Sequence, residues 1–219
     1  RGLLIILLFV STTNIFAEQA SPSIVPSVKI AEKLEGAYQL RSVMNIFVSA
    51  ADTQSGRFSA QQIMESLKGF NGANVNITIG KGKGDITLVQ DNKDTANHSP
   101  VFRGFDDQAY RLIITKEGIT IRSASARGLF YGAMSLVQLL EKAEYNRLSC
   151  FKITDWPDLK VRGISDDISR GQVSTPENFK RIIRFIARYK MNTYMPYLED
   201  MLTFTSYPAI GVNRGALTK

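Results

Sequence analysis

Two pairs of neighbouring carboxylates lie in the last third of the sequence. Asp166 and Asp167 fall within residues 161–168, which have the pattern of a strand, and Glu199 and Asp200 directly follow the next strand-like segment. Adjacent side chains of a strand point to opposite faces, so Asp166 and Asp167 cannot face each other as an acid–base pair. In sheets of parallel strands the ligand site lies at the carboxyl ends of the strands. We therefore predict Glu199 and Asp200 as candidate substrate-binding residues.

Other reactive groups are scarce. His98 is the only histidine and Cys150 the only cysteine, which excludes a His-pair or cysteine-based zinc site and any intrachain disulfide. Residues 80–84, Gly-Lys-Gly-Lys-Gly, lack the spacing of a phosphate-binding loop and the Ser or Thr that follows its lysine. We predict a hairpin turn at this segment and a solvated loop around His98. We expect no metal and no cofactor.

The chain has 219 residues, a formal net charge of +7 and 44% hydrophobic residues, enough for a sizeable core. A basic balance can indicate nucleic-acid binding, but the basic residues are scattered, so we expect no nucleic-acid partner. The densest basic group is Arg181, Arg184 and Arg188, on one face of a predicted helix. We interpret this group as the solvated outer face of that helix.

The first residues indicate export. Arg1 precedes an apolar run over residues 2–10, and Ala17 provides the small residue of a cleavage site. This order is typical of a secretory signal peptide, and the run is shorter than the roughly 20 apolar residues of a membrane span. We expect residues 1–17 to be a signal peptide and the mature protein to be secreted or periplasmic in a bacterium, with no membrane span. The alternative is a buried N-terminal strand or helix.

The middle of the chain has the pattern of an α/β sandwich over residues 38–155. Residues 18–37 are polar and interrupted by prolines, and we predict a linker that leads into the first strand. One helix is predicted behind a cap at Ser59 and is expected to stop at Gly69 and Gly72, and a second is predicted behind a cap at Ser125. The predicted strands are residues 43–49, 75–79, 86–89, 109–115, 119–122 and 148–154. Residues 116–118, with Gly118, are predicted to join strands 109–115 and 119–122 in a compact hairpin.

A break in the pattern at Asp155-Trp156-Pro157-Asp158 indicates a domain boundary. After it, residues 161–168 have the pattern of a strand, 177–190 of a helix and 192–198 of a second strand. Strand, helix and strand over this length predict a βα unit that opens a parallel arrangement. We expect Trp156 to pack between the two domains, with stacking on a sugar as the alternative.

Several short motifs carry a resemblance to a known family. Residues 110–121 and the motif Ser-Ala-Arg-Gly-Leu-Phe-Tyr-Gly at 125–132 closely resemble the end of the zincin-like domain of glycoside hydrolase family 20, the β-N-acetylhexosaminidases. Residues 155–170, with Asp-Trp-Pro, Val-Arg-Gly and Asp-Ile-Ser-Arg, resemble the first strand of that family's catalytic barrel. Lys-Met-Asn-Thr at 190–193 is similar to the approach to its second strand. The resemblance covers residues 22–219 and is strongest in the second half of the chain.

The resemblance implies an α/β fold. An α+β sandwich over residues 38–155 would be followed by the beginning of a (β/α)8 TIM barrel over residues 156–219. Only about 60 residues follow Pro157, whereas a complete barrel takes about 250. We therefore expect the natural protein to continue past Lys219.

The resemblance also implies an activity. It is the removal of terminal N-acetylhexosamine from oligosaccharides or glycoconjugates by retaining hydrolysis, in which the substrate's own acetamido group attacks. The family's catalytic Asp-Glu dipeptide does not occur after residue 157, so we expect the catalytic residues beyond Lys219 and no activity from this fragment. Arg162 stands where the family has a sugar-binding arginine, and its planar donors suit neighbouring hydroxyls. Asp167 is expected to hold a loop or Arg170.

The second predicted strand departs from the family pattern. The family has a histidine there, whereas residues 194–200 read Tyr-Met-Pro-Tyr-Leu-Glu-Asp, which leaves the sugar preference open. Two other interpretations also stay open. One is another glycosidase with a zincin-like domain before a barrel, of the O-GlcNAc-removing or α-glucuronidase type. The other is a non-catalytic carbohydrate-binding protein.

Overall fold

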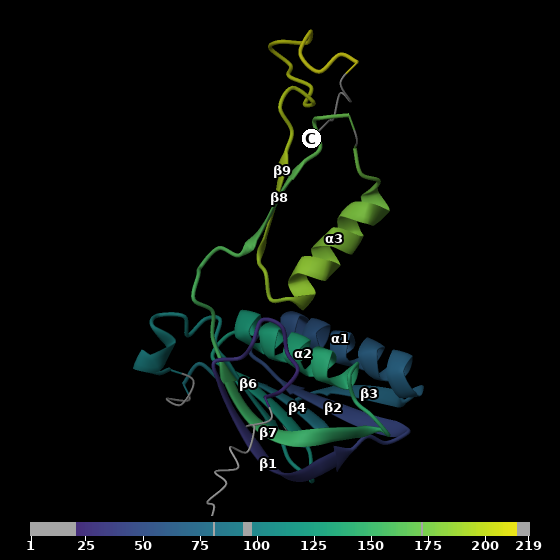
Figure 1. Ribbon diagram of the computed structural model, residues 1–219, viewed down its shortest axis with the longest axis vertical. Helices are drawn as coiled ribbons and strands as arrows, with labels where there is room; N and C mark the ends of the chain where they lie inside the picture. Colours follow the sequence, from purple (N-terminus) through teal and green to yellow (C-terminus); the bar gives the residue numbers. More distant parts are fainter. Residues whose placement is uncertain (1–20, 81, 94–97, 172, 214–219) are drawn as a thin grey trace, which may run out of the picture.

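The structure, a computed structural model, describes residues 21–80, 82–93, 98–171 and 173–213. The predicted signal peptide, residues 1–17, lies outside the described residues. Figure 1 shows a large twisted sheet with two helices on one face, and a narrower extension made by the last helix and the last two strands. The predicted α/β class is therefore confirmed. Within the described ranges, no helix is both long enough and apolar enough to cross a bilayer.

Seven strands form the large sheet. They are β1 (Ile30–Gln39), β2 (Val43–Ser49), β3 (Asn74–Ile79), β4 (Ile86–Gln90), β5 (Tyr110–Ile114), β6 (Ile119–Ser123) and β7 (Arg147–Asp155). Their order across the sheet is β1-β7-β5-β6-β4-β2-β3. β3, β2, β4 and β6 run parallel, whereas β5, β7 and β1 extend the sheet by antiparallel pairing. The predicted β5–β6 hairpin is confirmed.

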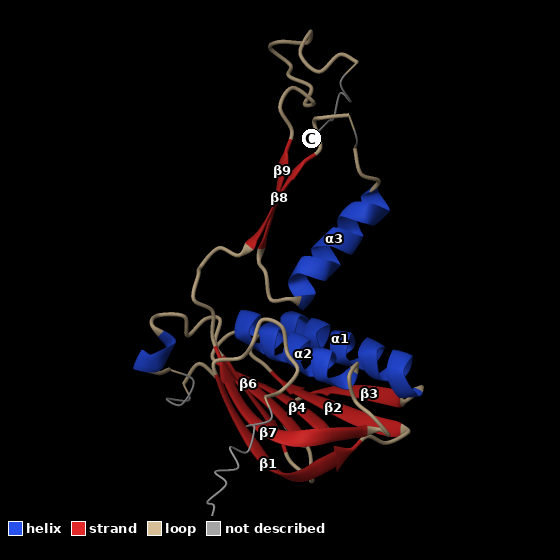
Figure 2. Ribbon diagram, viewed as in Figure 1, coloured by secondary structure: helices blue, strands red, loops and turns tan. Residues whose placement is uncertain are grey.

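Two helices, blue in Figure 2, cover one face of this sheet. They are α1 (Thr53–Asn71) and α2 (Ala126–Leu140). α2 begins where predicted, because the Ser125 hydroxyl accepts a hydrogen bond from Gly128 N at 3.0 Å. Leu112, Ile121 and Leu136 are fully buried in the core between helices and sheet. We call β1 to β7 with α1 and α2 the sheet domain.

The predicted start of α1 at Ser59 is wrong. The helix begins at Thr53, behind Asp52, whose Oδ1 accepts a hydrogen bond from Ser55 N at 3.0 Å. This carboxylate satisfies one of the free amides of the first helical turn. Ser59 lies inside the helix, fully buried, and its hydroxyl donates to Ser55 O at 3.0 Å. Of the two glycines predicted to stop the helix, Gly72 caps it with a φ of 67°, whereas Gly69 lies inside it, so the stop at Gly69 is wrong.

The predicted linker over residues 18–37 is wrong from Ile30 onward. Ile30 begins β1, which pairs antiparallel with β7 and places Ile30 opposite Thr154. β1 lies at the edge of the sheet, where only one side is paired and charged side chains are common, which explains its polar sequence. The sheet domain therefore begins before residue 38.

The predicted hairpin between β3 and β4 is also wrong. Both strands pair in parallel with β2, one on each side of it, so their connection must cross β2. The glycines permit this crossing at close range. A Cβ on Gly84 would lie 2.5 Å from Asn45 O, and one on Gly82 would collide with the Phe47 ring.

The extension contains a strand, a helix and a strand, as predicted. They are β8 (Gly163–Asp167), α3 (Pro176–Arg188) and β9 (Thr193–Tyr197), which we call the βα unit. β8 and β9 pair in parallel and form a sheet separate from the seven-stranded one. Ile186 of α3 is buried, but Ile183 and Phe185 are 49% and 57% exposed. Much apolar surface of the βα unit is therefore exposed.

Candidate functional site

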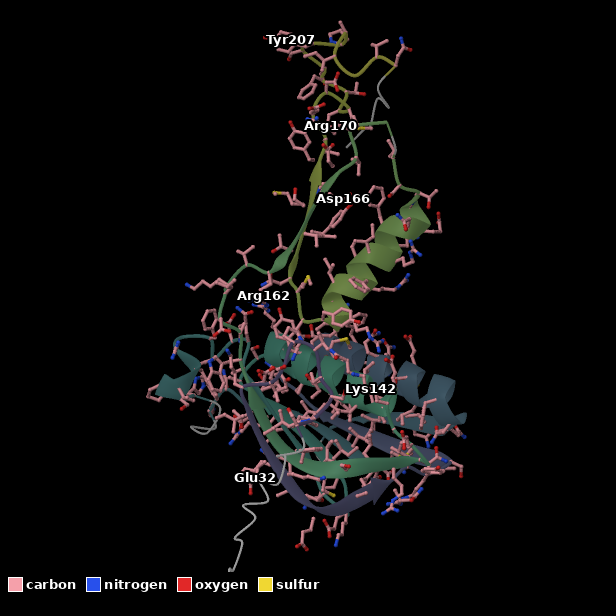
Figure 3. The ribbon with its side chains drawn as sticks, in the orientation of Figure 1. Glu32, Lys142, Arg162, Asp166, Arg170 and Tyr207 are labelled. Atoms are coloured by element: carbon pink, nitrogen blue, oxygen red, sulfur yellow. The ribbon has the colours of Figure 1, made fainter. Side chains whose placement is uncertain are left out.

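The carboxyl ends of β8 and β9 bring three charged groups together. Arg170 lies between two carboxylates: its Nε is 2.9 Å from Asp167 Oδ2, and its Nη2 is 3.5 Å from Glu199 Oε1. The Tyr197 hydroxyl also donates to Glu199 Oε1, at 3.3 Å. Figure 3 places Arg170 far from the sheet domain. Parallel pairing thus brings Arg170 and Glu199, 29 positions apart in the sequence, to one end of the βα unit.

Tight turns hold these groups in place. Asp167 Oδ1 accepts hydrogen bonds from Ser169 Oγ at 2.6 Å and from Ser169 N at 3.0 Å. These bonds to Ser169, with the Arg170 charge, lower the pKa of Asp167. The prediction that Asp167 holds this loop and Arg170 is confirmed. At the end of β9, Glu199 has a φ of 44°, in the left-handed region, and Asp200 follows, exposed at the same end.

Asp166 and Asp167 lie on opposite faces of β8, as predicted. The Tyr194 hydroxyl donates to Asp166 Oδ2 at 2.7 Å, and the Tyr194 ring meets Phe179 of α3 with 6.1 Å between ring centroids. Asp166 therefore faces α3. Burial and the nearby Asp166 raise the pKa of Tyr194 to about 12. Asp167, the next residue of β8, therefore points away from α3.

Arg162 lies at the other end of β8, beside the sheet domain (Figure 3). Its Nε and Nη2 donate to Lys190 O at 3.0 and 2.8 Å. Its Nη1 donates to Leu159 O at 2.6 Å and to Gln108 Oε1 at 3.0 Å. The guanidinium also lies over the Tyr131 ring, 5.3 Å from its centroid. These contacts tie Arg162 into the junction of the sheet domain and the βα unit.

The structure brings together two of the three residues predicted to bind substrate. Glu199 and Asp200 share the end of β9, whereas Arg162 precedes the opposite end of β8. Sugar binding by Arg162 stays a prediction that its contacts do not support. Sequence reasoning passed over Arg170 as a ligand-binding residue, although Arg170 also follows the carboxyl end of a strand. The rule that selected Glu199 and Asp200 selects Arg170 as well.

A cavity of about 190 Å³ lies at the junction of the sheet domain and the βα unit. Trp156 lines it and packs against Phe102, with ring centroids 5.4 Å apart. Asp155 and Lys190 line the same cavity. Trp156 therefore packs at the junction, as predicted. Among the described residues, no group of three His, Cys, Asp or Glu side chains is placed to hold a metal ion.

Comparison with protein families identifies the sheet domain. Residues 21–156, more than half of the chain, match the model of glycosyl hydrolase family 20, domain 2. The chain belongs to glycosyl hydrolase family 20. The resemblance drawn from the sequence is thereby confirmed, and the match includes residues that the sequence analysis assigned to a linker.

Named relatives of this family 20 chain are hexosaminidases. The beta-N-acetylhexosaminidase of Cellulomonas fimi is 31% identical over 96 residues, which are 43% of this chain and 19% of the relative. The beta-hexosaminidase of Vibrio furnissii is 25% identical over 184 residues, 84% of this chain and 27% of the relative. A mutant Streptomyces plicatus beta-hexosaminidase in complex with product (GlcNAc) has a similar fold. Its TM-score is 0.69 at 25% identity, over 87% of this chain and 37% of that one. The family 20 chain thus spans well under half of each of these relatives.

Proposed function

We propose that this chain is the amino-terminal portion of an exported β-N-acetylhexosaminidase. Such an enzyme removes terminal N-acetylhexosamine from oligosaccharides or glycoconjugates. The family 20 match over residues 21–156 and the names of the relatives support this activity. The basic start, the apolar run over residues 2–10 and the small residue Ala17 support export.

The βα unit is proposed to be the start of a (β/α)8 barrel. β8 and β9 are parallel and joined through α3, which is the repeating step of such a barrel. The exposed apolar surface of α3 fits a unit that further strands and helices would cover. In such barrels the carboxyl ends of the strands form the active site. The meeting of Arg170 with Glu199 at that end is the observation that carries the proposal.

Arg170, Glu199 and Asp200 supply the donors and acceptors that a sugar needs. A guanidinium presents a planar set of N–H donors, and carboxylates accept hydrogen bonds from hydroxyls. Together they can hold neighbouring hydroxyls of a terminal sugar in one orientation. Asp167 is the residue that keeps Arg170 in place, through the ion pair at 2.9 Å.

The proposed hydrolysis retains the anomeric configuration. The acetamido oxygen of the substrate attacks the anomeric carbon while a carboxylic acid protonates the leaving oxygen, and water then opens the ring so formed. That acid belongs to an Asp-Glu pair expected beyond Lys219, because no such dipeptide follows residue 157. In this proposal, the residues of the present chain hold the sugar and do not cleave it.

The test uses 4-nitrophenyl N-acetyl-β-D-glucosaminide and a protein that contains this chain together with the proposed Asp-Glu pair. We expect this protein to release 4-nitrophenol and to form the β anomer first, as seen by proton NMR. The present chain alone should release none above buffer. Arg170→Ala should lower kcat/KM by about 100-fold, as for loss of a charge-assisted hydrogen bond. Arg127→Ala, at an exposed arginine that pairs with Asp107 in the sheet domain, is the matched control with unchanged kcat/KM.

Three outcomes contradict the proposal. First formation of the α anomer would exclude retaining hydrolysis. Turnover by the present chain alone would show that its acid is already present. Unchanged kcat/KM in Arg170→Ala would remove the strand-end cluster from the substrate site.

A further inference from the structure

A buried ion pair connects the βα unit to the sheet domain. Lys190 follows α3, and its Nζ lies 3.0 Å from Oδ2 of Asp155, the last residue of β7. The two side chains are 8% and 9% exposed. The Tyr110 hydroxyl of β5 donates to the same Asp155 oxygen at 2.9 Å. Because a buried charge is costly without its partner, Lys190 and Asp155 stabilise each other only while the two units stay together.

Arg162 holds the backbone of the same lysine. Two of its guanidinium nitrogens donate to Lys190 O, and a third donates to Gln108 Oε1 of the sheet domain. Lys190 has a φ of 62°, a conformation that is uncommon for residues other than glycine. Its side chain and its carbonyl are thus both fixed, one by Asp155 and the other by Arg162.

The same residues join the starts of the two strands. Arg162 O accepts hydrogen bonds from Asn192 N at 2.7 Å and from Thr193 N at 3.0 Å. Asn192 Oδ1 in turn accepts from Arg162 N at 2.9 Å. The first pair of the β8–β9 ladder, Gly163 opposite Thr193, follows immediately. A slip of one residue would reverse the faces of every side chain in a strand, so whatever fixes this first pair fixes the whole register.

We propose that Arg162, Lys190 and Asp155, which we call the junction clamp, are positioning residues. They fix the register and direction of β8 and β9 against the seven-stranded sheet. Through these strands they set the distance between Arg170 and Glu199 at the far end. The sheet domain thereby contributes to the reaction indirectly, because it positions β8 and β9, the strands that carry Arg170 and Glu199. The effect on catalysis rests on the proposed function, whereas the effect on the strands does not.

The first test measures hydrogen–deuterium exchange of the whole chain without substrate. Arg162→Ala should speed exchange in peptides covering residues 163–167 and 193–197 by at least tenfold, with β5 and β6 unchanged. Guanidinium at about 20 mM, far below denaturing concentrations, should restore protection by filling the vacated site, and urea at the same concentration should not. Arg162→Lys should restore it only in part, because one ammonium cannot serve the partners of a planar guanidinium.

A matched control and two further variants complete this test. Arg184→Ala, at an exposed arginine of α3, should leave exchange unchanged. The milder Asn192→Ala should speed exchange of the β9 peptide several-fold. The effects of Lys190→Met and Arg162→Ala on exchange should not add when the two are combined. Both remove contacts that hold Lys190, one at its side chain and the other at its carbonyl. Normal protection of β8 and β9 in Arg162→Ala, or equal loss of protection in β5 and β6, would overturn the proposal.

The second test measures kinetics in a protein that contains this chain together with the proposed Asp-Glu pair. Arg162→Ala should lower kcat/KM for 4-nitrophenyl N-acetyl-β-D-glucosaminide by about tenfold or more per folded enzyme, and guanidinium should recover it. A purely structural role would reduce only the amount of folded enzyme, with kcat and KM of that fraction unchanged. This result would show that the junction clamp contributes to folding and does not position the site. If the unaltered protein has no turnover, the proposed function fails, while the exchange test still decides the junction clamp.

Discussion

The sheet domain and the βα unit differ in how fully each buries its apolar side chains with residues of its own. In the sheet domain, Ile121, Leu129 and Leu136 are fully buried between α2 and the sheet. In the βα unit, Ile186 is buried, but Ile183 on the same helix is 49% exposed. The sheet domain therefore has a complete hydrophobic core, whereas the βα unit depends on neighbouring elements for its packing. Order in the βα unit must therefore come largely from its contacts with the sheet domain.

The largest expected effect tests this contrast with one residue type in two places. Ile121→Ala should lower the free energy of unfolding by about 2–5 kcal/mol, because it leaves a cavity in a filled core. Ile183→Ala, its matched control in α3, should change it by less than about 0.5 kcal/mol. Urea denaturation followed by circular dichroism gives both values. Similar costs at the two positions would mean that the βα unit is as well packed as the sheet domain.

An intermediate effect is expected at the crossing of β2. Gly84→Ala should destabilise the sheet domain by about 1–3 kcal/mol, because its Cβ would lie 2.5 Å from Asn45 O. Gly69→Ala is the matched control, because nothing lies within 4 Å of its added Cβ in the helix. It should stabilise by about 0.5–1 kcal/mol. Thermal unfolding of both variants separates the outcomes. Unchanged stability in Gly84→Ala would show that the backbone at the crossing can move away from the added Cβ.

The smallest effect concerns two tyrosines at high pH, one in each unit. Burial, helped by Asp85 in one case and Asp166 in the other, raises the pKa of both Tyr38 and Tyr194 to about 12. A phenol whose pKa is raised by folding holds its proton more tightly in the folded state. Its stabilisation is complete below about pH 10, the unfolded pKa, and is lost as the pH rises through about 12.

Ultraviolet absorbance of the phenolate measures this titration in each unit. Compared with the unaltered chain, Tyr194→Phe and Tyr38→Phe should each lack one phenol that titrates near pH 12. Loss of a phenol titrating near pH 10 in Tyr194→Phe alone would show that water reaches Tyr194. The βα unit would then be looser than its hydrogen bond to Asp166, 2.7 Å long, indicates.

Local patterns in the sequence predicted much of the fold. α2 and the β5–β6 hairpin follow from the cap at Ser125 and from alternating polarity, signals that act within a few positions. β1 was missed because its partner β7 is far away in the sequence, and its polar residues suit an edge. The crossing of β2 was missed because two strands joined by a short glycine-rich segment resemble a hairpin unless the strand between them is known.

The candidate site was predictable only in part. Glu199 and Asp200 follow from their place at a strand end, and the structure brings Glu199 to Arg170. The location of Arg162 could not be predicted from spacing, because it depends on contacts with Lys190 and Gln108, which come from other elements. Arg170 was identifiable from the strand-end rule alone.

The junction clamp also has a consequence for the order of assembly. β7 ends at Asp155, so every strand of the large sheet precedes the βα unit in the sequence. During synthesis on the ribosome, an amino-terminal domain can fold while the rest is still being made. The Tyr110 hydroxyl and Asp155 Oδ2, which lie 2.9 Å apart, would then be in place before Lys190 is synthesised. The sheet domain would then serve as a preformed template on which β8 and β9 pair as they are synthesised.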